Sequence, residues 1–281
     1  MPALLVCHGA NDWLEEPVRF PSIQRYVAVD DPTHDRLLQS GIPPDSIDIL
    51  RTAVDLERFP LRENWSQRPQ KALLFSNYLW NDSDLRIFRE GCRLAGIDTL
   101  DVIGTGMATE KRAPEKILAQ YDIVFAKGRS AHEAVATGAA VILTDCRKIA
   151  GMLTAKNHDV WRPLNLGFKT LTHTATPKAL KRAIENYDVS DVKIVAKRLR
   201  SEGSIDQATD TLTRIYESVL STGGERIPLI PEIEFQQAAS AYQHKITQYF
   251  KKHKLTAPLE RFVWVTSRKI YTGLIKLLGR K

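Results

Sequence analysis

Between residues 71 and 145, short apolar runs alternate with amphipathic stretches, and this alternation restricts the fold more than any other feature of the chain. The runs with the length of strands are Ala72–Phe75, Leu100–Ile103, Ile123–Ala126 and Ala140–Leu143. Helical patterns lie between them, at Leu85–Ala95, Pro114–Gln120 and Ala131–Thr137. Strands without regular polar positions are typical of a parallel sheet covered by helices on both faces. The segment therefore predicts an α/β fold with a Rossmann-like parallel sheet.

The flanking residues extend this prediction. Leu4–Cys7 and Arg25–Val29 have the pattern of buried strands, and a short helix should end before Pro43. After Asp145 we expect an irregular stretch to about Thr176, followed by helices, which are Pro177–Asn186, Ile205–Leu220, Glu232–His253 and Pro258–Leu278. The predicted parts are thus a partial N-terminal portion with its connector (1–58), the Rossmann-like domain (59–222) and a helical tail (223–281).

Composition indicates a folded intracellular protein. Of the 281 residues, 43% are hydrophobic and 26% charged, which favours a packed interior over disorder. Cys7, Cys92 and Cys146 form neither a disulfide framework nor a CxxC metal pair, which fits a reducing cytosol. The first residues resemble a buried strand more than a signal peptide, and no run approaches the ~20 apolar residues of a membrane-spanning helix. We expect a cytoplasmic protein without a dedicated metal site.

The positive charge is concentrated in the tail. Residues 251–281 hold nine Lys or Arg against the single Glu260, so most of the net charge of +7 lies there. Apolar residues fall mainly on one face of a helix over 258–278, with basic residues on the remainder. This pattern favours a helix on an anionic membrane surface. A helix that packs on another domain is the alternative, and nucleic-acid binding is the poorest fit because stacking aromatics are not interleaved with the basic residues.

The turn after Ile123–Ala126 is the best candidate for a binding site. Parallel α/β sheets bind ligands outside the carboxyl ends of their strands, and the turn Lys127–Ser130 lies at such an end. Free N–H groups and the dipole of the following helix favour an anion there. Gly128 lets the backbone approach a phosphate closely, while Lys127 and Arg129 add positive charge.

Residues 121–145 resemble the donor-site motif of the group 1 glycosyltransferases, which have the GT-B fold. In that family a helix with Glu-Ala-x-Ala-x-Gly follows a phosphate-facing turn, and residues 133–138 match it. The resemblance implies that Glu133 binds the ribose of a sugar nucleotide and that Gly128, Arg129 and Ser130 contact its diphosphate. More loosely, residues 52–59 resemble the interdomain connector, and residues 6–9 resemble a strand end whose histidine, here His8, faces the cleft.

The chain departs from the family pattern at several points. A Glu often stands eight residues before the ribose-binding one, and that position is Phe125. An Arg and a Lys often follow the first strand of the donor domain, and residues 76–82 contain neither. Only about 55 residues precede the connector, fewer than the ~100–150 of a usual domain. The remainder of an N-terminal domain is truncated, supplied by a partner, or lost.

Structural alternatives exist for the site residues. Ser130 and Glu133 also form a capping-box pattern, which is compatible with a nucleotide contact. His8 is a structural histidine or a catalytic group at a strand end.

The function predicted from these features is transfer of a sugar from a nucleoside-diphosphate sugar to a cell-envelope glycan or a lipid-linked acceptor, with no cofactor besides the donor. The alternatives are a degenerate GT-B domain that binds nucleotide or a partner without catalysis, and another Rossmann-type enzyme such as an epimerase.

Overall fold

The computed structural model describes residues 2–10, 17–77, 81–104, 113–222 and 232–252. Its strands are β1 (Ala3–Cys7), β2 (Ile23–Ala28), β3 (Ile47–Ile49), β4 (Lys71–Phe75), β5 (Thr99–Ile103), β6 (Ile123–Ala126), β7 (Ala140–Thr144), β8 (Lys148–Met152) and β9 (His173–Thr174). Its α-helices are α1 (Asp31–Gln39), α2 (Asp82–Leu94), α3 (Arg129–Ala136), α4 (Ala155–Trp161), α5 (Pro177–Glu185), α6 (Val189–Glu202), α7 (Ile205–Thr222) and α8 (Glu232–Lys252). Short 3-10 helices are η2 (Pro44–Ser46), η4 (Pro114–Lys116), η5 (Leu118–Gln120) and η6 (Phe168–Thr170).

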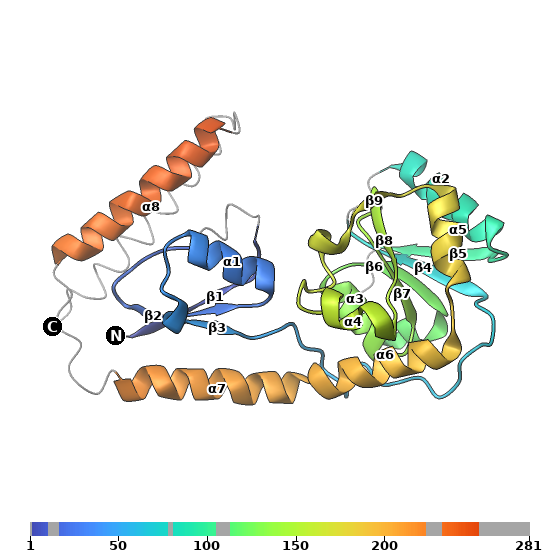
Figure 1. Cartoon of the computed structure of the whole chain (residues 1–281), viewed down its shortest axis with the longest axis horizontal. Helices are drawn as coiled ribbons and strands as arrows, with labels where there is room; N and C mark the ends of the chain where they lie inside the picture. The colour runs from blue at the N-terminus through green and yellow to red at the C-terminus, as the bar shows by residue number, and fades with distance from the viewer. Residues whose placement is uncertain (1, 11–16, 78–80, 105–112, 223–231, 253–281) are drawn as a thin grey trace.

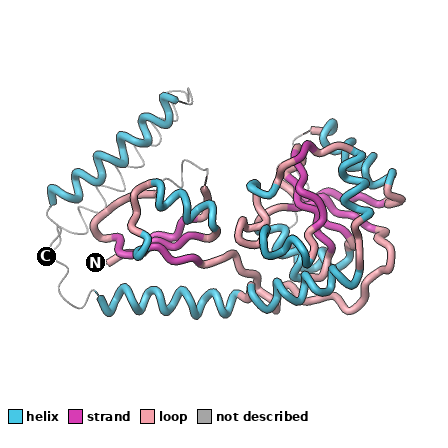
Figure 2. Tube along the Cα trace, in the orientation of Figure 1, coloured by secondary structure: helices cyan, strands magenta, loops and turns pink. Residues whose placement is uncertain are grey.

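A six-stranded sheet forms the larger part of the molecule, with the order β5-β4-β6-β7-β8-β9 (Figure 2). The strands from β5 to β7 pair in parallel, as the alternating pattern predicts. Strand β8 pairs antiparallel with β7, and β9 pairs antiparallel with β8, so the sheet is mixed at one edge.

The expectation of an irregular stretch from 146 to 176 was therefore wrong, because this segment contains β8, α4 and β9. The reversal after β7 depends on Asp145, whose Oδ1 accepts hydrogen bonds from the amides of Arg147 (3.0 Å) and Lys148 (2.7 Å). Gly151, at a φ of 119°, lies inside β8 and weakens its strand pattern. Residues 148–152 form a strand because they pair with β7, which is a tertiary contact that the local sequence does not indicate.

Residues of the central strands alternate between two cores on the two faces of this sheet. One core joins the sheet to α3 and α6 and includes Leu73, Val124 and Val141. The other joins it to α2 and α5 and includes Leu74, Phe125 and Ile142. The covered parallel sheet of the sequence prediction is confirmed.

The structure differs from the predicted helices at two places. Helix α6 was missed, because its apolar positions have a weak helical pattern. Its N-cap is Asp188, whose side chain accepts from the amides of Ser190 and Asp191. The predicted helix Pro114–Gln120 is two successive 3-10 turns, η4 and η5.

A second sheet lies in the N-terminal part, with the order β1-β2-β3 and parallel pairing throughout. It packs with α1 around a small core that includes Tyr26, Ala28 and Leu37. The long helix α7 runs beneath the small sheet and contacts β1 and β2, while α6, which precedes it, lies beneath the larger part of the molecule (Figure 1). A bridge between Val54 and Ser204 also joins the segment after β3 to the start of α7.

Among the helices of the described segments, none is long and apolar enough to cross a membrane. The linker predicted at Gly223-Gly224 and the basic helix predicted over 258–278 lie outside the described residues.

Candidate functional site

The turn after β6 presents free amides at the carboxyl edge of the large sheet. Gly128 is the N-cap of α3, with φ 57° and ψ −137°, a conformation that suits glycine alone. Its carbonyl accepts from the amides of Ala131 and His132, whereas the N–H groups of Arg129 and Ser130 have no backbone acceptor in the described part of the chain. No atom lies within 4 Å of the position that a Cβ on Gly128 would occupy. A ligand can therefore approach these amides closely.

Because α3 begins at Arg129 with Gly128 as its cap, Ser130 stands inside the first turn. The predicted capping box, with Ser130 as the cap, is therefore wrong. Glycine takes the cap position because only it adopts this backbone conformation without strain.

Arg129 and Glu133 lie one helical turn apart and form an ion pair. The Arg129 Nε donates to the Glu133 Oε1 at 3.0 Å. The Glu133 side chain is only 13% exposed, while that of Arg129 is 79% exposed. The structure thus brings together a nearly buried carboxylate, an exposed cation and two free amides on one turn of helix.

His132 is buried behind this turn and makes its own contact with it. Its Nδ1 lies 2.9 Å from the Gly128 carbonyl oxygen, and since that oxygen can only accept, Nδ1 carries the proton. Burial lowers the pKa of His132 to about 3, with a further lowering from the charge of Arg162. The ring is neutral at physiological pH and holds the Gly128 carbonyl in place.

A turn over residues 162–167 joins the carboxyl ends of the two sheets. The Gly128 amide, just after β6, donates to the Leu166 carbonyl at 2.9 Å. The Asp31 amide, just after β2, donates to the Pro163 carbonyl at 3.0 Å. Because ligands of parallel sheets bind beyond the carboxyl ends of the strands, this turn lies where the two edges meet.

The backbone of this turn, for which the sequence predicts no role, is unusual. Asn165 and Leu166 have φ values of 61° and 47°, a left-handed conformation that residues other than glycine seldom adopt. The Asn165 Oδ1 is buried without a hydrogen-bond partner. Strain and unpaired polar atoms concentrate at functional sites, and the one local signal was the dipeptide Leu166-Gly167 after an asparagine.

The N-terminal candidates are placed as follows. His8 follows β1 directly and is exposed. It lies at the edge of the small sheet, whereas Glu133 lies on α3 at the edge of the large sheet. Asp30 caps α1, with its Oδ1 accepting from the Thr33 amide at 2.8 Å. Asp31 pairs with the Arg51 Nη2 at 2.8 Å. Both aspartates thus have structural roles, and His8 stays a candidate for chemistry because it is exposed at the end of β1.

The departures from the family pattern have clear structural counterparts. Phe125 is fully buried and packs edge-on against Phe88, with ring centroids 5.2 Å apart, so no carboxylate reaches the site from that position. After β4, Ser76 lies against Cys146, whose Sγ donates to the Ser76 Oγ at 3.4 Å. Burial raises the pKa of the Cys146 thiol to about 11, which keeps it protonated. Lys127, between β6 and Gly128, is half-buried.

Within the described residues, no group of three or more His, Cys, Asp or Glu side chains is arranged to hold a metal ion.

Comparisons with known proteins give structural neighbours but no sequence relatives. No protein-family model matches the sequence, and the search of curated proteins gives no match. A glycosyltransferase from Rickettsia africae ESF-5 superposes with a TM-score of 0.50 at 14% identity, over 70% of this chain and 64% of that chain. A sucrose-phosphate synthase from Thermosynechococcus elongatus (TM-score 0.46, 13% identity, 72% and 60% covered) and the pneumococcal O-GlcNAc transferase in complex with UDP and GlcNAc (0.44, 10%, 71% and 46%) are more distant.

The first of these similarities shows the fold, which is that of the GT-B glycosyltransferases. This chain spans less than two thirds of the length of that neighbour.

Proposed function

We propose that this chain binds a nucleoside-diphosphate sugar at the turn before α3 and transfers the sugar to an acceptor. The observation that carries the proposal is the pair of free amides, those of Arg129 and Ser130, at a helix N-terminus, with the carboxylate of Glu133 one turn further on. A helix N-terminus with unpaired N–H groups attracts the negative charge of a diphosphate. A carboxylate accepts hydrogen bonds from paired hydroxyls, as those of a ribose are.

Each residue has a distinct role in this proposal. The amides of Arg129 and Ser130 bind the diphosphate, Gly128 allows its approach, and Lys127 and Arg129 supply positive charge. Glu133 exchanges its ion pair with Arg129 for the ribose hydroxyls. As the bond to the sugar breaks, negative charge grows on the departing nucleoside diphosphate, and donors already oriented toward it lower the barrier.

His8 and the acceptor belong to the other side of the site. We propose that His8, exposed at the end of β1, faces the sugar and takes the proton of the acceptor hydroxyl. A cell-envelope glycan or a lipid-linked glycan is the proposed acceptor. It would be met at an anionic membrane surface through the basic residues of 251–281, whose nine Lys or Arg support such a contact.

Binding of the donor is tested by isothermal titration with UDP-, GDP- and ADP-sugars, for the wild type and for Glu133→Ala. One of the donors should bind, and the variant should lose about tenfold in affinity, as expected for hydrogen bonds to a charged group. Glu185→Ala is the matched control, because Lys181 and Glu185 form an ion pair of the same spacing on α5. Equal affinities for wild type and Glu133→Ala would contradict the assignment.

Catalysis is tested separately, with the labelled donor that binds, in the presence and absence of membrane lipids carrying endogenous acceptors. Label should enter the lipid or glycan fraction, and His8→Ala should reduce its rate of incorporation without changing donor affinity. Donor binding without any incorporation would instead indicate a nucleotide-binding domain without catalysis. Epimerisation of the free donor would indicate the other class of Rossmann-type enzyme.

A further inference from the structure

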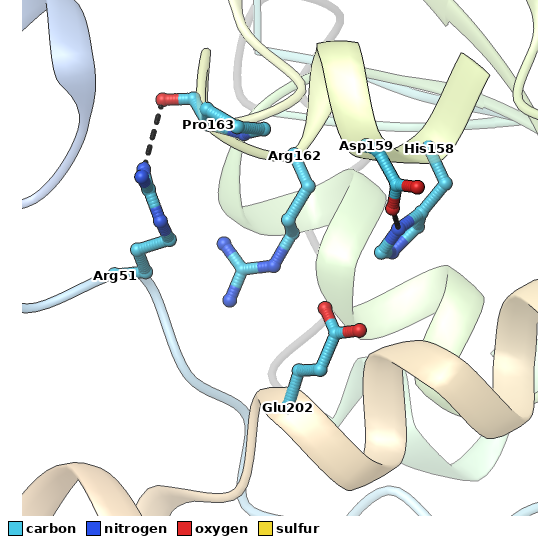
Figure 3. A pocket seen from close by; sticks show the side chains of 6 residues that line it. All are labelled: Arg51, His158, Asp159, Arg162, Pro163 and Glu202. Carbon is cyan, nitrogen blue, oxygen red and sulfur yellow. Dashed lines mark hydrogen bonds and ion pairs between the residues drawn. The ribbon is translucent and has the colours of Figure 1, made fainter.

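A pocket lies at the junction between the segment after β3 and the large domain, and none of the residues assigned to the donor site lines it (Figure 3). Its volume is about 180 Å³. It is lined by Arg51, His158, Asp159, Arg162, Pro163 and Glu202. These residues come from the segment that joins the two sheets, from α4 with the turn after it, and from the end of α6. Such a space holds several water molecules or one small ligand.

Arg162 is the charged group at the centre of this pocket. The residue is only 5% exposed, and its guanidinium projects into the space between Arg51 and Glu202 (Figure 3). The Nη2 donates to the Thr52 carbonyl at 2.7 Å, but Nε and Nη1 have no hydrogen-bond partner. Burial of a cation with unpaired N–H groups is unfavourable unless an acceptor compensates for it. The unpaired N–H groups therefore point to a ligand that accepts hydrogen bonds.

Arg51 adds a second positive charge on the wall of the pocket. Its Nη1 donates to the Pro163 carbonyl at 3.1 Å, and its Nη2 pairs with Asp31 at 2.8 Å. Burial, and then the charge of Arg51, lower the pKa of Arg162 to about 10. Arg162 thus keeps its charge at neutral pH, and the two cations repel each other across the pocket. An anion between them would relieve this repulsion.

Neither acidic residue of the pocket, Asp159 or Glu202, forms an ion pair with Arg162, although the charge of Glu202 offsets part of the lowering of the Arg162 pKa. Asp159 is occupied by Arg198, whose Nη2 lies 3.1 Å from its Oδ1. Glu202 is exposed at the end of α6, and in the described part of the chain no carboxylate lies within the 4.0 Å of an ion pair with Arg162. His158, on the opposite wall, is buried with an unpaired Nε2. The Nδ1 of His158 lies 3.4 Å from the Asp159 Oδ1 and donates to it, so the Nε2 is an acceptor. The unpaired donors of the pocket are thus the Nε and Nη1 of Arg162.

We propose that this pocket binds a small oxyanion, of phosphate size, through the Nε and Nη1 of Arg162 with support from the charge of Arg51. The site is separate from the turn before α3, and the proposal does not rest on the function proposed above. Because the pocket is built from the segment joining the two sheets and from the large domain, a bound anion fixes these two parts to each other. The oxyanion is a free phosphate or the phosphate group of a larger substrate.

Binding of inorganic phosphate is measured by isothermal titration, with chloride removed as phosphate is added so that the ionic strength stays constant. The wild type should bind phosphate, Arg162→Gln should weaken binding by about tenfold, and Arg51→Gln by less. Glu202→Gln should strengthen binding, because it removes a negative charge from the rim. Arg198 pairs with Asp159 and does not line the pocket. Arg198→Gln leaves the charge of Asp159 without this partner beside the pocket and should weaken phosphate binding.

A second arm separates this pocket from the donor site. Arg93→Gln, a change on the surface of α2 where Arg93 pairs with Glu90, should leave the affinity for inorganic phosphate unchanged, and Arg162→Gln should leave the affinity for a nucleoside diphosphate unchanged. If Arg162→Gln does not fold, the opposite effects of Arg51→Gln and Glu202→Gln, both at more accessible side chains, decide the question. Absence of phosphate binding to the wild type, or its loss in Arg129→Gln with no effect at Arg162, Arg51 and Glu202, would overturn the proposal. Loss of nucleoside diphosphate affinity in Arg162→Gln would show instead that the pocket belongs to the donor site.

Discussion

The Nε of Arg129 lies 3.0 Å from the Oε1 of Glu133, so the cation proposed for the diphosphate and the carboxylate proposed for the ribose are paired with each other. Arg129 is exposed and Glu133 is nearly buried, and the carboxylate is therefore held in place while the arginine is free to swing away. When the proposed donor binds, this ion pair has to break, so that Arg129 can contact the diphosphate and Glu133 the ribose hydroxyls.

Replacement of Arg129 by Gln should have opposite effects on two ligands. A nucleoside without phosphates should bind more tightly, because Glu133 no longer has to leave its ion pair, whereas a nucleoside diphosphate should bind more weakly by about tenfold. Titration of both ligands into wild type and variant measures the two effects. Parallel changes for both ligands would contradict the exchange.

The same substitution should hardly change the stability of the fold. Ion pairs with an exposed partner contribute ~0–1 kcal/mol, so the free energy of unfolding should fall by less than about 1 kcal/mol. Chemical denaturation measures it. Arg93→Gln is the control, because Arg93 pairs with Glu90 on the surface of α2 and lies outside the site.

Gly128→Ala should destabilise the fold and weaken donor binding together. The backbone at φ 57° and ψ −137° is accessible almost only to glycine, so alanine should cost about 1–3 kcal/mol through strain, although its Cβ meets no atom within 4 Å. Denaturation curves and donor titrations measure the two effects. Gly96→Ala is the matched control, since Gly96 has a φ of 78° and equally open space. Its stability should fall while donor affinity stays the same, and a loss of affinity there would mean that strain alone explains the Gly128 result.

His132 should make the fold less stable in acid. Its pKa is about 3 in the folded chain, whereas an unperturbed histidine has a pKa of 6.5, so between these values the unfolded chain binds more protons. The contribution of neutral His132 to the free energy of unfolding should therefore be fully present above pH 6.5. Below that pH it should fall by about 1.4 kcal/mol for each pH unit, as far as pH 3. Urea denaturation at pH 7.5, 5.5 and 4.5 measures this slope. His132→Gln should reduce it, and the exposed His173→Gln should not; equal slopes in all proteins would contradict the burial argument.

The thiols of Cys92 and Cys146 should react slowly in the folded protein. Both are buried, and burial raises their pKa values to about 12 and about 11. Since the thiolate is the reactive form, a thiol-specific reagent at pH 8 should label them only as fast as the chain opens. The rate of labelling with and without urea tests this, and rapid labelling of the native protein would show that the carboxyl end of β7 opens readily.

The central fold and the turn before α3 could be predicted because their signals are local. The strands β4, β6 and β7 are short runs of mostly buried residues, and Gly128 and Glu133 lie within six residues of each other on one turn and helix. Hydrophobic periodicity and glycine conformation act over such distances, and a sequence displays them directly. The predicted cap at Ser130 lies two positions after the observed cap at Gly128, because two residue types that cap helices stand close together.

The sequence by itself thus determined the alternating α/β architecture, the glycine turn before α3 and the positive charge of residues 251–281. Only the tertiary structure decided that β8 and β9 reverse the sheet, that Leu166 binds the Gly128 amide, and that Arg162 meets a carbonyl 110 positions away at Thr52. Each of these features depends on contacts between residues far apart in the chain. Such contacts form only when the packed core fixes both partners, and no local pattern of residues records them.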